Sequence, residues 1–436
     1  MTSPVRRDAA AAPASQVRGL IFVWIFAAAF ILYLQRSTLA VVAVPLTHDY
    51  GFTKWQIAWL FNAFLIPYTL FQIPGGLFGQ RVGARHGTLA CIALSLTGTA
   101  AFAFAPAFAA GTLVFVLFCG ARLLVGVAQG PLFPINAGLT QAWFPPRRWG
   151  LMNGLQVMGL SLGAAATPPL VSQLMTSHGW QFAVYATCVP GLLLALLWWW
   201  YVRDTPREHG AVSAAEIAHI ESGQRPAVAR SFNGRQVRRV LADRNILLLT
   251  LCYLLQNYVF YFFMNWSFTY LVESRGLTIL QSGGLAMIPL ATGALCAAFG
   301  GYLCDGICAR IGPRWGFRIM PMVALPLAAV LLFVALRTAS AYVAVATLAG
   351  CFGCAQMTEA PTWAATFWVA RDQASAATGI LNAGGNVGGI IGTFLVGYLT
   401  TLYGWGAAFA TGIAFALASA ATWLLVDTER RVADAP

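Results

Sequence analysis

The sequence predicts an all-α membrane protein with twelve transmembrane helices arranged as two six-helix halves. Of the 436 residues, 59% are hydrophobic and only 9% are charged, whereas soluble proteins carry about 25% charged residues. Twelve apolar stretches can be drawn, each close to or above the roughly 20 residues that a helix needs to cross a bilayer. One long polar segment lies near the middle of the chain, and the sequences on its two sides resemble each other.

The twelve apolar stretches follow one another with short polar connections. By residue number they are 19–46, 55–79, 87–106, 109–140, 149–175, 181–202, 245–272, 279–304, 316–337, 341–368, 375–402 and 405–426. The first is too long for the apolar core of a signal peptide and lacks a convincing cleavage site, so we expect it to be the first span. The expected organisation is a cytoplasmic tail, a first half, a cytoplasmic linker, a second half and a short cytoplasmic tail, over 1–18, 19–202, 203–244, 245–427 and 428–436.

The distribution of basic residues predicts the orientation. With both termini in the cytoplasm, 21 of the 26 Lys and Arg residues fall in cytoplasmic segments, three in outer loops and two inside spans. This is the positive-inside pattern. The net charge of +12 therefore reflects membrane topology, and we expect no nucleic-acid partner. The protein is expected to be a multi-pass inner-membrane protein and a monomer. The linker arginines are expected to lie in a solvated loop that fixes the topology, or else to contact anionic lipid headgroups.

Within the linker, Ser213 and Glu216 have the spacing of a capping box, which predicts a short helix beginning after Ser213.

The two halves carry a repeat. The segment from Gly126 to Gln129 aligns with Gly353 to Gln356, and Pro131 aligns with Pro361 at an offset of 230. Many membrane carriers are built from such internal repeats, with a binding site near the bilayer midplane.

Three charges inside the spans are the strongest functional signal. Arg36 and Arg122 lie deep in apolar stretches, and Glu359 is the only acid well inside a span. An intramembrane arginine costs roughly 2.5–3.5 kcal/mol on insertion scales, so it usually faces a cavity or a partner. Its guanidinium matches a carboxylate. We expect Arg36 to bind a small organic anion, with hydroxyl contacts from Tyr33, three residues earlier, and from Tyr68.

The roles of Arg122 and Glu359 are left open. Arg122 either contacts the substrate or bonds backbone carbonyls freed by the nearby prolines. Glu359 is interpreted as a proton carrier, with two alternatives: a fixed counter-ion to the arginines, or a carboxylate wetted by the outer vestibule. Polar or aromatic side chains expected to complete the cavity, or else to bond neighbouring helices, are Gln156, Asn257, Trp363, Asn382 and Asn386, together with Asn153 and Gln256.

Two loops resemble signatures of the major facilitator superfamily. The segment from Gly76 to His86 resembles its first signature loop, and Gly301 to Arg314 resembles the repeat of that loop in the second half. The resemblance implies a cytoplasmic gate in which a loop carboxylate pairs with arginines. The residues at the matching positions are Gln80, Arg81, Arg85, Asp305, Arg310 and Arg314. Gln80 stands where the family usually has an aspartate, so we expect the first half of this gate to be weaker.

More narrowly, the chain is similar to the anion:cation symporter branch, which includes hexuronate, galactonate, glucarate and allantoate permeases and sialin-like carriers. The similarity is carried by the segments from Tyr33 to Arg36, Arg122 to Pro134 and Tyr261 to Gly276. It implies proton-coupled symport of organic anions by alternating access. The branch commonly has acids at the positions of Gln35 and Gln129, and glutamine cannot titrate. Proton symport through Glu359 alone and anion exchange or facilitation therefore both stay open.

Three other functional classes are alternatives to transport of an anion: drug carriers, membrane enzymes and sensors. Drug carriers of the superfamily usually place acids rather than arginines in the cavity. The sequence offers no nucleophile and base pair, phosphate loop or metal cluster, so we expect no enzyme activity, no cofactor and no metal site. Cys351 and Cys354 are interpreted as packing residues. A sensor that binds its ligand without transporting it stays open, because the two carboxylates are missing.

Overall fold

The computed structural model describes residues 15–108, 111–145, 148–221 and 234–429. All regular elements in these ranges are helices. Eleven candidate membrane spans are long and apolar enough to cross a bilayer, counting α4 with α5 and α14 with α15 as one span each. The expected span 149–175 forms the 30-residue helix α6 (Trp149–His178), but α6 is not among the eleven.

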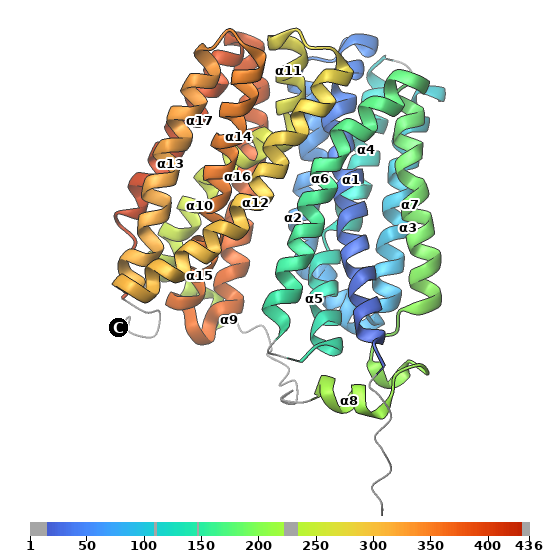
Figure 1. Ribbon diagram of the computed structural model, residues 1–436. Helices are drawn as coiled ribbons and strands as arrows, with labels where there is room; N and C mark the ends of the chain where they lie inside the picture. The colour runs from blue at the N-terminus through green and yellow to red at the C-terminus, as the bar shows by residue number, and fades with distance from the viewer. Residues whose placement is uncertain (1–14, 109–110, 146–147, 222–233, 430–436) are drawn as a thin grey trace, which may run out of the picture.

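The helices form two groups that stand side by side (Figure 1). The first helical group consists of α1 (Val17–Tyr50), α2 (Lys54–Val82), α3 (Ala84–Phe104), α4 (Gly111–Gln129), α5 (Leu132–Trp143), α6 and α7 (Trp180–Tyr201). The second helical group consists of α10 (Arg244–Asn265), α11 (Ser267–Arg275), α12 (Ile279–Ile311), α13 (Pro313–Arg337), α14 (Ala341–Met357), α15 (Glu359–Ala370), α16 (Ala374–Tyr403) and α17 (Trp405–Trp423). In the sequence, the two groups are separated by two short helices, α8 (Ala214–Glu221) and α9 (Gly234–Ala242).

Three stretches that the sequence predicts as single spans are each broken into two helices. The stretch 109–140 is divided between α4 and α5 at Gly130 and Pro131, where proline lacks the N–H that would continue the helix. The stretch 341–368 is divided between α14 and α15 at Thr358, directly before Glu359. The stretch 245–272 is divided at Trp266. Two of these breaks therefore lie beside residues singled out from the sequence, Gln129 and Glu359.

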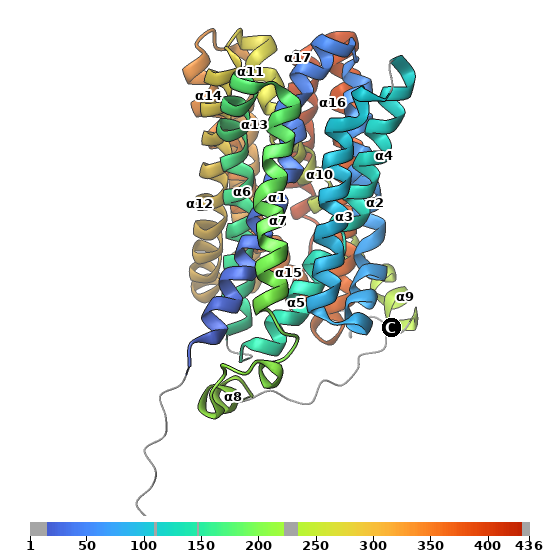
Figure 2. The same cartoon turned by 90° about the vertical axis from the view of Figure 1, so that its right-hand side faces the viewer.

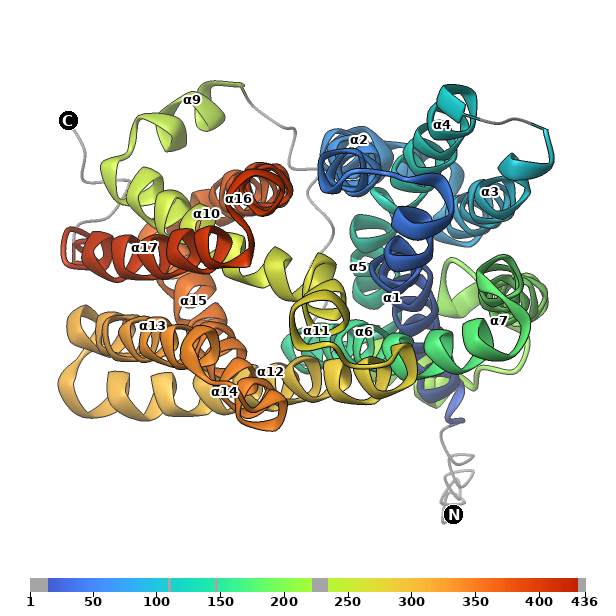
Figure 3. The same cartoon turned by 90° about the horizontal axis from the view of Figure 1, so that it is seen from above.

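The two groups contact each other through α6 with α12, α2 with α16, and α1 with α10 and α11. Seen along the helices, α2 lies beside α16 and α6 beside α12 (Figure 3). We call the end where α1 begins and α17 ends the terminal end. At this end, α5 packs mainly on α2 and α3, and α15 on α12 and α16, each within its own group. The groups are therefore joined mainly toward the opposite end.

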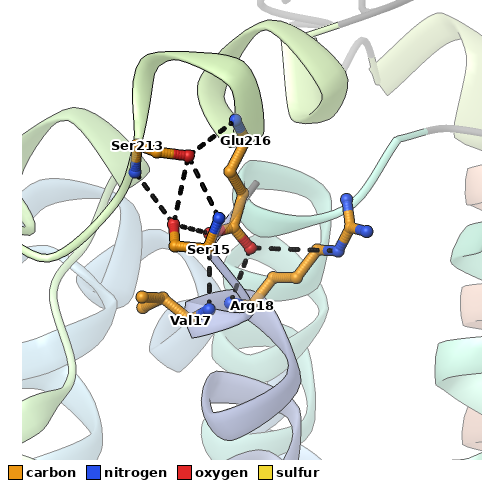
Figure 4. Close-up of polar contacts among 5 residues, drawn as sticks. All are labelled: Ser15, Val17, Arg18, Ser213 and Glu216. Carbon is orange, nitrogen blue, oxygen red and sulfur yellow. Dashed lines mark hydrogen bonds and ion pairs between the residues drawn. The ribbon is translucent and has the colours of Figure 1, made fainter. Parts of the chain in front are cut away.

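The linker helix α8 is fastened to the start of α1 at the terminal end (Figures 1 and 2). Figure 4 shows the Glu216 carboxylate accepting hydrogen bonds from the Ser15 hydroxyl and from the backbone N–H groups of Val17 (3.3 Å) and Arg18 (3.1 Å). Glu216 is fully buried. Its carboxylate satisfies N–H groups that the first turn of α1 leaves without intrahelical partners.

The expected helix start after Ser213 is confirmed, because the Ser213 hydroxyl accepts from the Glu216 N–H at 3.3 Å. The expected second half of the capping box is wrong. The Ser213 N–H donates to the Ser15 hydroxyl at 2.8 Å, because the Glu216 side chain turns toward α1.

Candidate functional site

Arg36 lies inside a box of aromatic rings between the two groups. Its guanidinium carbon is 5.0 Å from the ring centroids of Tyr33, Phe64 and Tyr68, and 5.7 Å from that of Tyr261. The guanidinium donates to the Tyr33 hydroxyl at 3.2 Å and to the Tyr261 hydroxyl at 3.0 Å. These are cation–π distances, and Arg36 is only 8% exposed. The predicted shared face of Tyr33 and Arg36 is confirmed.

Tyr68 and Tyr261 contact Arg36 in ways that the sequence did not predict, since a hydroxyl contact was expected from Tyr68 and not from Tyr261. Tyr68 presents its ring to the guanidinium and stacks on Phe64, with 5.5 Å between ring centroids. Tyr261, to which the sequence analysis gave no role, supplies a hydroxyl. That hydroxyl also donates to the Asn386 side-chain oxygen at 3.2 Å. Arg36 on α1 is thus linked through Tyr261 on α10 to Asn386 on α16.

Arg122 also contacts Phe64, with its guanidinium carbon 4.9 Å from the centroid of that ring. It is 6% exposed, and its Nε is buried without a hydrogen-bond partner in the described part of the chain. A small cavity in the first group is lined by Arg122 together with Gln35, Thr38 and Thr99. Phe64 therefore contacts both buried arginines.

The two glutamines at the family's acid positions are joined into one chain of hydrogen bonds. The Gln129 amide N–H donates to the Ser95 hydroxyl at 3.1 Å, and this hydroxyl donates to the Gln35 amide oxygen, also at 3.1 Å. The Gln35 amide N–H in turn donates to the Thr187 carbonyl at 3.2 Å. All three linked side chains are buried. The chain from α4 through α3 to α1 and α7 contains no titratable group.

Glu359 begins α15 and is surrounded by hydrogen-bond donors. Its Oε1 accepts from the Tyr253 hydroxyl at 2.7 Å and from the Trp363 indole N–H at 2.9 Å. Its Oε2 lies 3.4 Å from the Gln256 amide nitrogen. Trp363, which was expected to complete the cavity, thus donates to Glu359, whereas the sequence predicted no role for Tyr253.

Arg36, Arg122 and Glu359 form no ion pair with one another or with any other residue that the structure describes. A guanidinium matches a carboxylate in charge and in hydrogen-bond geometry.

Most of the other predicted cavity residues are not linked to Arg36, and two of them form hydrogen bonds within or between helices. Asn257 donates to the Tyr253 carbonyl at 2.8 Å along its own helix. Asn382 on α16 donates to the Gln72 amide oxygen on α2 at 2.8 Å, which joins the two groups. Gln156 is buried, and its amide oxygen lacks a partner within the described ranges. Only Asn386 among the predicted amides is linked to Arg36.

The predicted gate residues at the terminal end are apart in this conformation. Arg314 pairs with Glu429 at 3.2 Å rather than with Asp305. Arg85 stacks on Trp199 at 4.4 Å, and its backbone N–H donates to Asp204 at 2.7 Å. For the described residues, Gln80, Arg81, Asp305 and Arg310 take part in none of the ion pairs found.

An ion pair joins the groups at the opposite end. The Lys54 ammonium on α2 lies 2.8 Å from the Glu273 carboxylate on α11 and 5.3 Å from the centre of the Trp405 ring. The two side chains are 23% and 27% exposed. Lys54 is the only lysine of the chain.

Comparison with known proteins identifies the family. The Major Facilitator Superfamily model matches residues 25–365 and 285–436. The chain is 28% identical to a D-galactonate transporter of Escherichia coli over 97% of this chain and 98% of the relative. It is 28% identical to a probable galactarate/D-glucarate transporter of Bacillus subtilis (89% and 87% covered) and 27% identical to a hexuronate transporter of the same organism (87% of each).

Solved structures have the same fold. A bacterial homologue of the human lysosomal transporter Spinster, inward-facing and unoccupied, superposes with a TM-score of 0.75 at 16% identity over 95% of this chain and 98% of that one. A D-xylose–proton symporter superposes with a TM-score of 0.69 at 13% identity over 92% and 96%. The chain is thus a multi-pass membrane protein of the bacterial inner-membrane type, and it belongs to the Major Facilitator Superfamily of transporters.

Proposed function

We propose that the protein is a secondary active transporter that moves a small organic anion, such as a sugar acid, by alternating access. The observation that carries this proposal is the pair of buried arginines, Arg36 and Arg122, without ion-pair partners in the described chain. The names of the relatives, which are transporters of galactonate, galactarate or hexuronate, support the same ligand class.

The proposed topology has twelve spans, with α6 as the fifth, in two pseudo-symmetric halves over 19–202 and 245–427. Both termini and the linker 203–244 face the cytoplasm, as the arginine distribution favours. In this orientation the Lys54–Glu273 pair closes the outer side and the separated gate residues lie on the inner side. The conformation described above is then the inward-facing state, and the gate at Asp305 and Arg85 forms only when the carrier opens outward.

Glu359 is the proposed proton carrier. With both arginines cationic and Glu359 ionised, the empty site carries a net charge of +1. A bound monoanion neutralises it, and protonation of Glu359 makes room for a second negative charge. The amide chain from Gln129 to Gln35 supports this assignment, because glutamines that cannot titrate occupy both positions at which the resembled branch commonly has acids.

Uptake by proteoliposomes tests this proposal. Organic-anion counterflow should be measured first, because a sensor would bind its ligand without exchanging it. Accumulation should then be compared with and without an inward proton gradient in the wild type and in Glu359→Gln. We expect the gradient to drive accumulation only in the wild type. Gradient-driven accumulation that survives the substitution would show that Glu359 is not the coupling site.

Anion exchange is the second candidate, favoured by the same amide chain. A carrier without a coupled proton returns through the membrane only when its site is filled. If the protein is an exchanger, uptake should require an anion inside the vesicles, and its rate should not depend on the proton gradient. Preloading the vesicles with unlabelled substrate separates the two mechanisms.

A further inference from the structure

We propose that this site selects monoanionic polyhydroxy acids over dicarboxylates of the same length, with Glu359 as the residue that makes the distinction. The inference rests on the proposed function and adds the substrate class to it. Its basis is a difference between the two ends of the site: the Arg36 end has free hydrogen-bond donors, and the Glu359 end has free acceptors.

At the Arg36 end, the groups without partners are donors. The Nε of Arg122 and the Nδ2 of Asn386 are both buried and unpartnered among the described residues. The orientation of the Asn386 amide follows from its neighbour, since its oxygen accepts from the Tyr261 hydroxyl at 3.2 Å. Donors beside two guanidinium groups bind a carboxylate, whose oxygens are acceptors only.

At the Glu359 end, the groups that can still form hydrogen bonds are acceptors. Oε1 of Glu359 already accepts two short hydrogen bonds, from Tyr253 and Trp363. Oε2 has only a long contact of 3.4 Å with the Gln256 amide. A carboxylate oxygen accepts more than one hydrogen bond, so Oε2 has capacity left for a donor.

Gln256 adds a second acceptor at this end. Its nitrogen donates to the Ala355 carbonyl at 3.1 Å and faces Glu359. Its oxygen is buried without a partner in the part of the chain that is described. The reverse amide orientation would place this oxygen against a carbonyl and a carboxylate, so the observed orientation is the favourable one. The substrate at this end must therefore donate hydrogen bonds.

Helix α10 sets the distance between the two ends. It carries Tyr261 at the Arg36 end, and Tyr253 and Gln256 at the Glu359 end. Along the helix axis, Tyr261 lies about 7.5 Å from Gln256 and about 12 Å from Tyr253, at 1.5 Å per residue. An extended chain advances roughly 1.2 Å per covalent bond, so about six to ten bonds cover this axial range. An open-chain six-carbon acid has about six bonds from its carboxylate carbon to its last hydroxyl, so with its carboxylate at Arg36 it extends toward Gln256 and Glu359.

A second carboxylate at the far end of the same chain would meet an ionised carboxylate and a free amide oxygen. Like charges in contact oppose binding strongly. A simple fatty acid of that length would leave the acceptors at the Glu359 end unpaired, and sites built to bond a hydroxyl reject analogues that lack it. Both analogues should therefore bind more weakly than a hydroxylated monoanion.

Three probes of equal chain length test the inference by isothermal titration of the purified full-length protein at neutral pH. They are D-galactonate, galactarate, which has a second terminal carboxylate, and hexanoate, which has no hydroxyls. We expect galactarate and hexanoate to bind at least about tenfold more weakly than galactonate. In Glu359→Gln, the difference between galactonate and galactarate should shrink to threefold or less, because the opposing charge is gone. Glu208→Gln, which removes an exposed acid in the linker, is the control and should leave the ratio unchanged.

Several outcomes would overturn the inference. Wild-type protein that binds galactarate or hexanoate as tightly as galactonate would contradict it, as would an unchanged preference in Glu359→Gln. Failure of all three acids to bind would also reject this substrate class. The proposed function is tested independently, because it requires only that some organic anion shows counterflow that depends on Arg36.

Discussion

The Arg36 guanidinium donates a hydrogen bond of 3.0 Å to the Tyr261 hydroxyl, and this contact joins the first helical group to the second at the candidate anion site. The hydroxyl fixes one edge of the guanidinium while the aromatic rings of the box lie around it. The binding group is therefore positioned before a ligand arrives, which reduces the cost of ordering it on binding.

Removing this hydroxyl should weaken the site without removing its charge. Hydrogen bonds to charged groups contribute about 1.5–3 kcal/mol, and 1.4 kcal/mol is tenfold in affinity. We expect Tyr261→Phe to raise the KM for the transported anion by about tenfold. The matched control is Tyr258→Phe on the same helix. It removes a hydroxyl that donates to the Ala408 carbonyl at 2.9 Å. An equal effect of both substitutions would assign the loss to packing of α10.

The Lys54–Glu273 pair should hold the outer side closed. Glu273→Gln removes the charge attraction between α2 and α11, so α11 should open more often. Ion pairs of this exposure contribute up to about 1 kcal/mol, so amide exchange over Ser267–Arg275 should accelerate about two- to fivefold. Hydrogen-exchange mass spectrometry gives this rate directly. Restoring slow exchange by Lys54→Glu combined with Glu273→Lys would confirm the pair, and unchanged exchange in Glu273→Gln would reject it.

The amide chain through Ser95 should act as a structural link. Ser95→Ala leaves the Gln129 N–H and the Gln35 oxygen without their partner, and each unsatisfied buried group costs about 1–3 kcal/mol. We expect a clear drop in the melting temperature of the detergent-solubilised protein. Ser161→Ala is the control, because that hydroxyl is exposed and bonds only its own helix. A melting temperature that stays at the wild-type value would show that the chain is not needed for stability.

Glu216 should stabilise the first turn of α1. Glu216→Ala removes an acceptor for the Val17 and Arg18 N–H groups, and loss of such a cap costs about 0.5–2 kcal/mol. Amide exchange at the start of α1 should accelerate, while Glu221→Ala, which breaks an exposed pair with Arg207, should not affect it. Equal exchange in both variants would show that α8 does not cap α1.

The sequence predicted those parts of the site that stand out chemically from a membrane span. Arg36, Arg122 and Glu359 are charges inside apolar stretches, and Tyr33 shares a face with Arg36 because it lies three residues before it. Phe64, Tyr253 and Tyr261 could not be distinguished from the other aromatic residues, because the chain has 29 Phe and 13 Tyr. Only the packing of helices that are distant in sequence brings these three residues to the site. Tyr253, Asn257 and Tyr261 do share a helical face by their spacing of four, which was the one available signal.

The same limit applies to the fold. The apolar stretches located the helices, whereas the three breaks within them were not predicted. Gly130 and Pro131 mark the first break by residue type. Thr358 and Trp266 are not helix-breaking residue types, so local propensity gives no sign of them. The partner of Glu216 was also missed, because the capping-box spacing describes only the helix in which it lies, and Val17 is far away in sequence.

In the proposed mechanism, Arg36, which has no ion-pair partner among the described residues, binds the transported anion. The most direct measurement is counterflow of radiolabelled D-galactonate in proteoliposomes that contain wild type, Arg36→Ala or Arg207→Ala, the last removing an exposed linker arginine. We predict counterflow in the wild type and in Arg207→Ala, and none in Arg36→Ala although that variant retains its folded state by circular dichroism. Wild-type counterflow in Arg36→Ala would contradict the claim and place the anion site elsewhere.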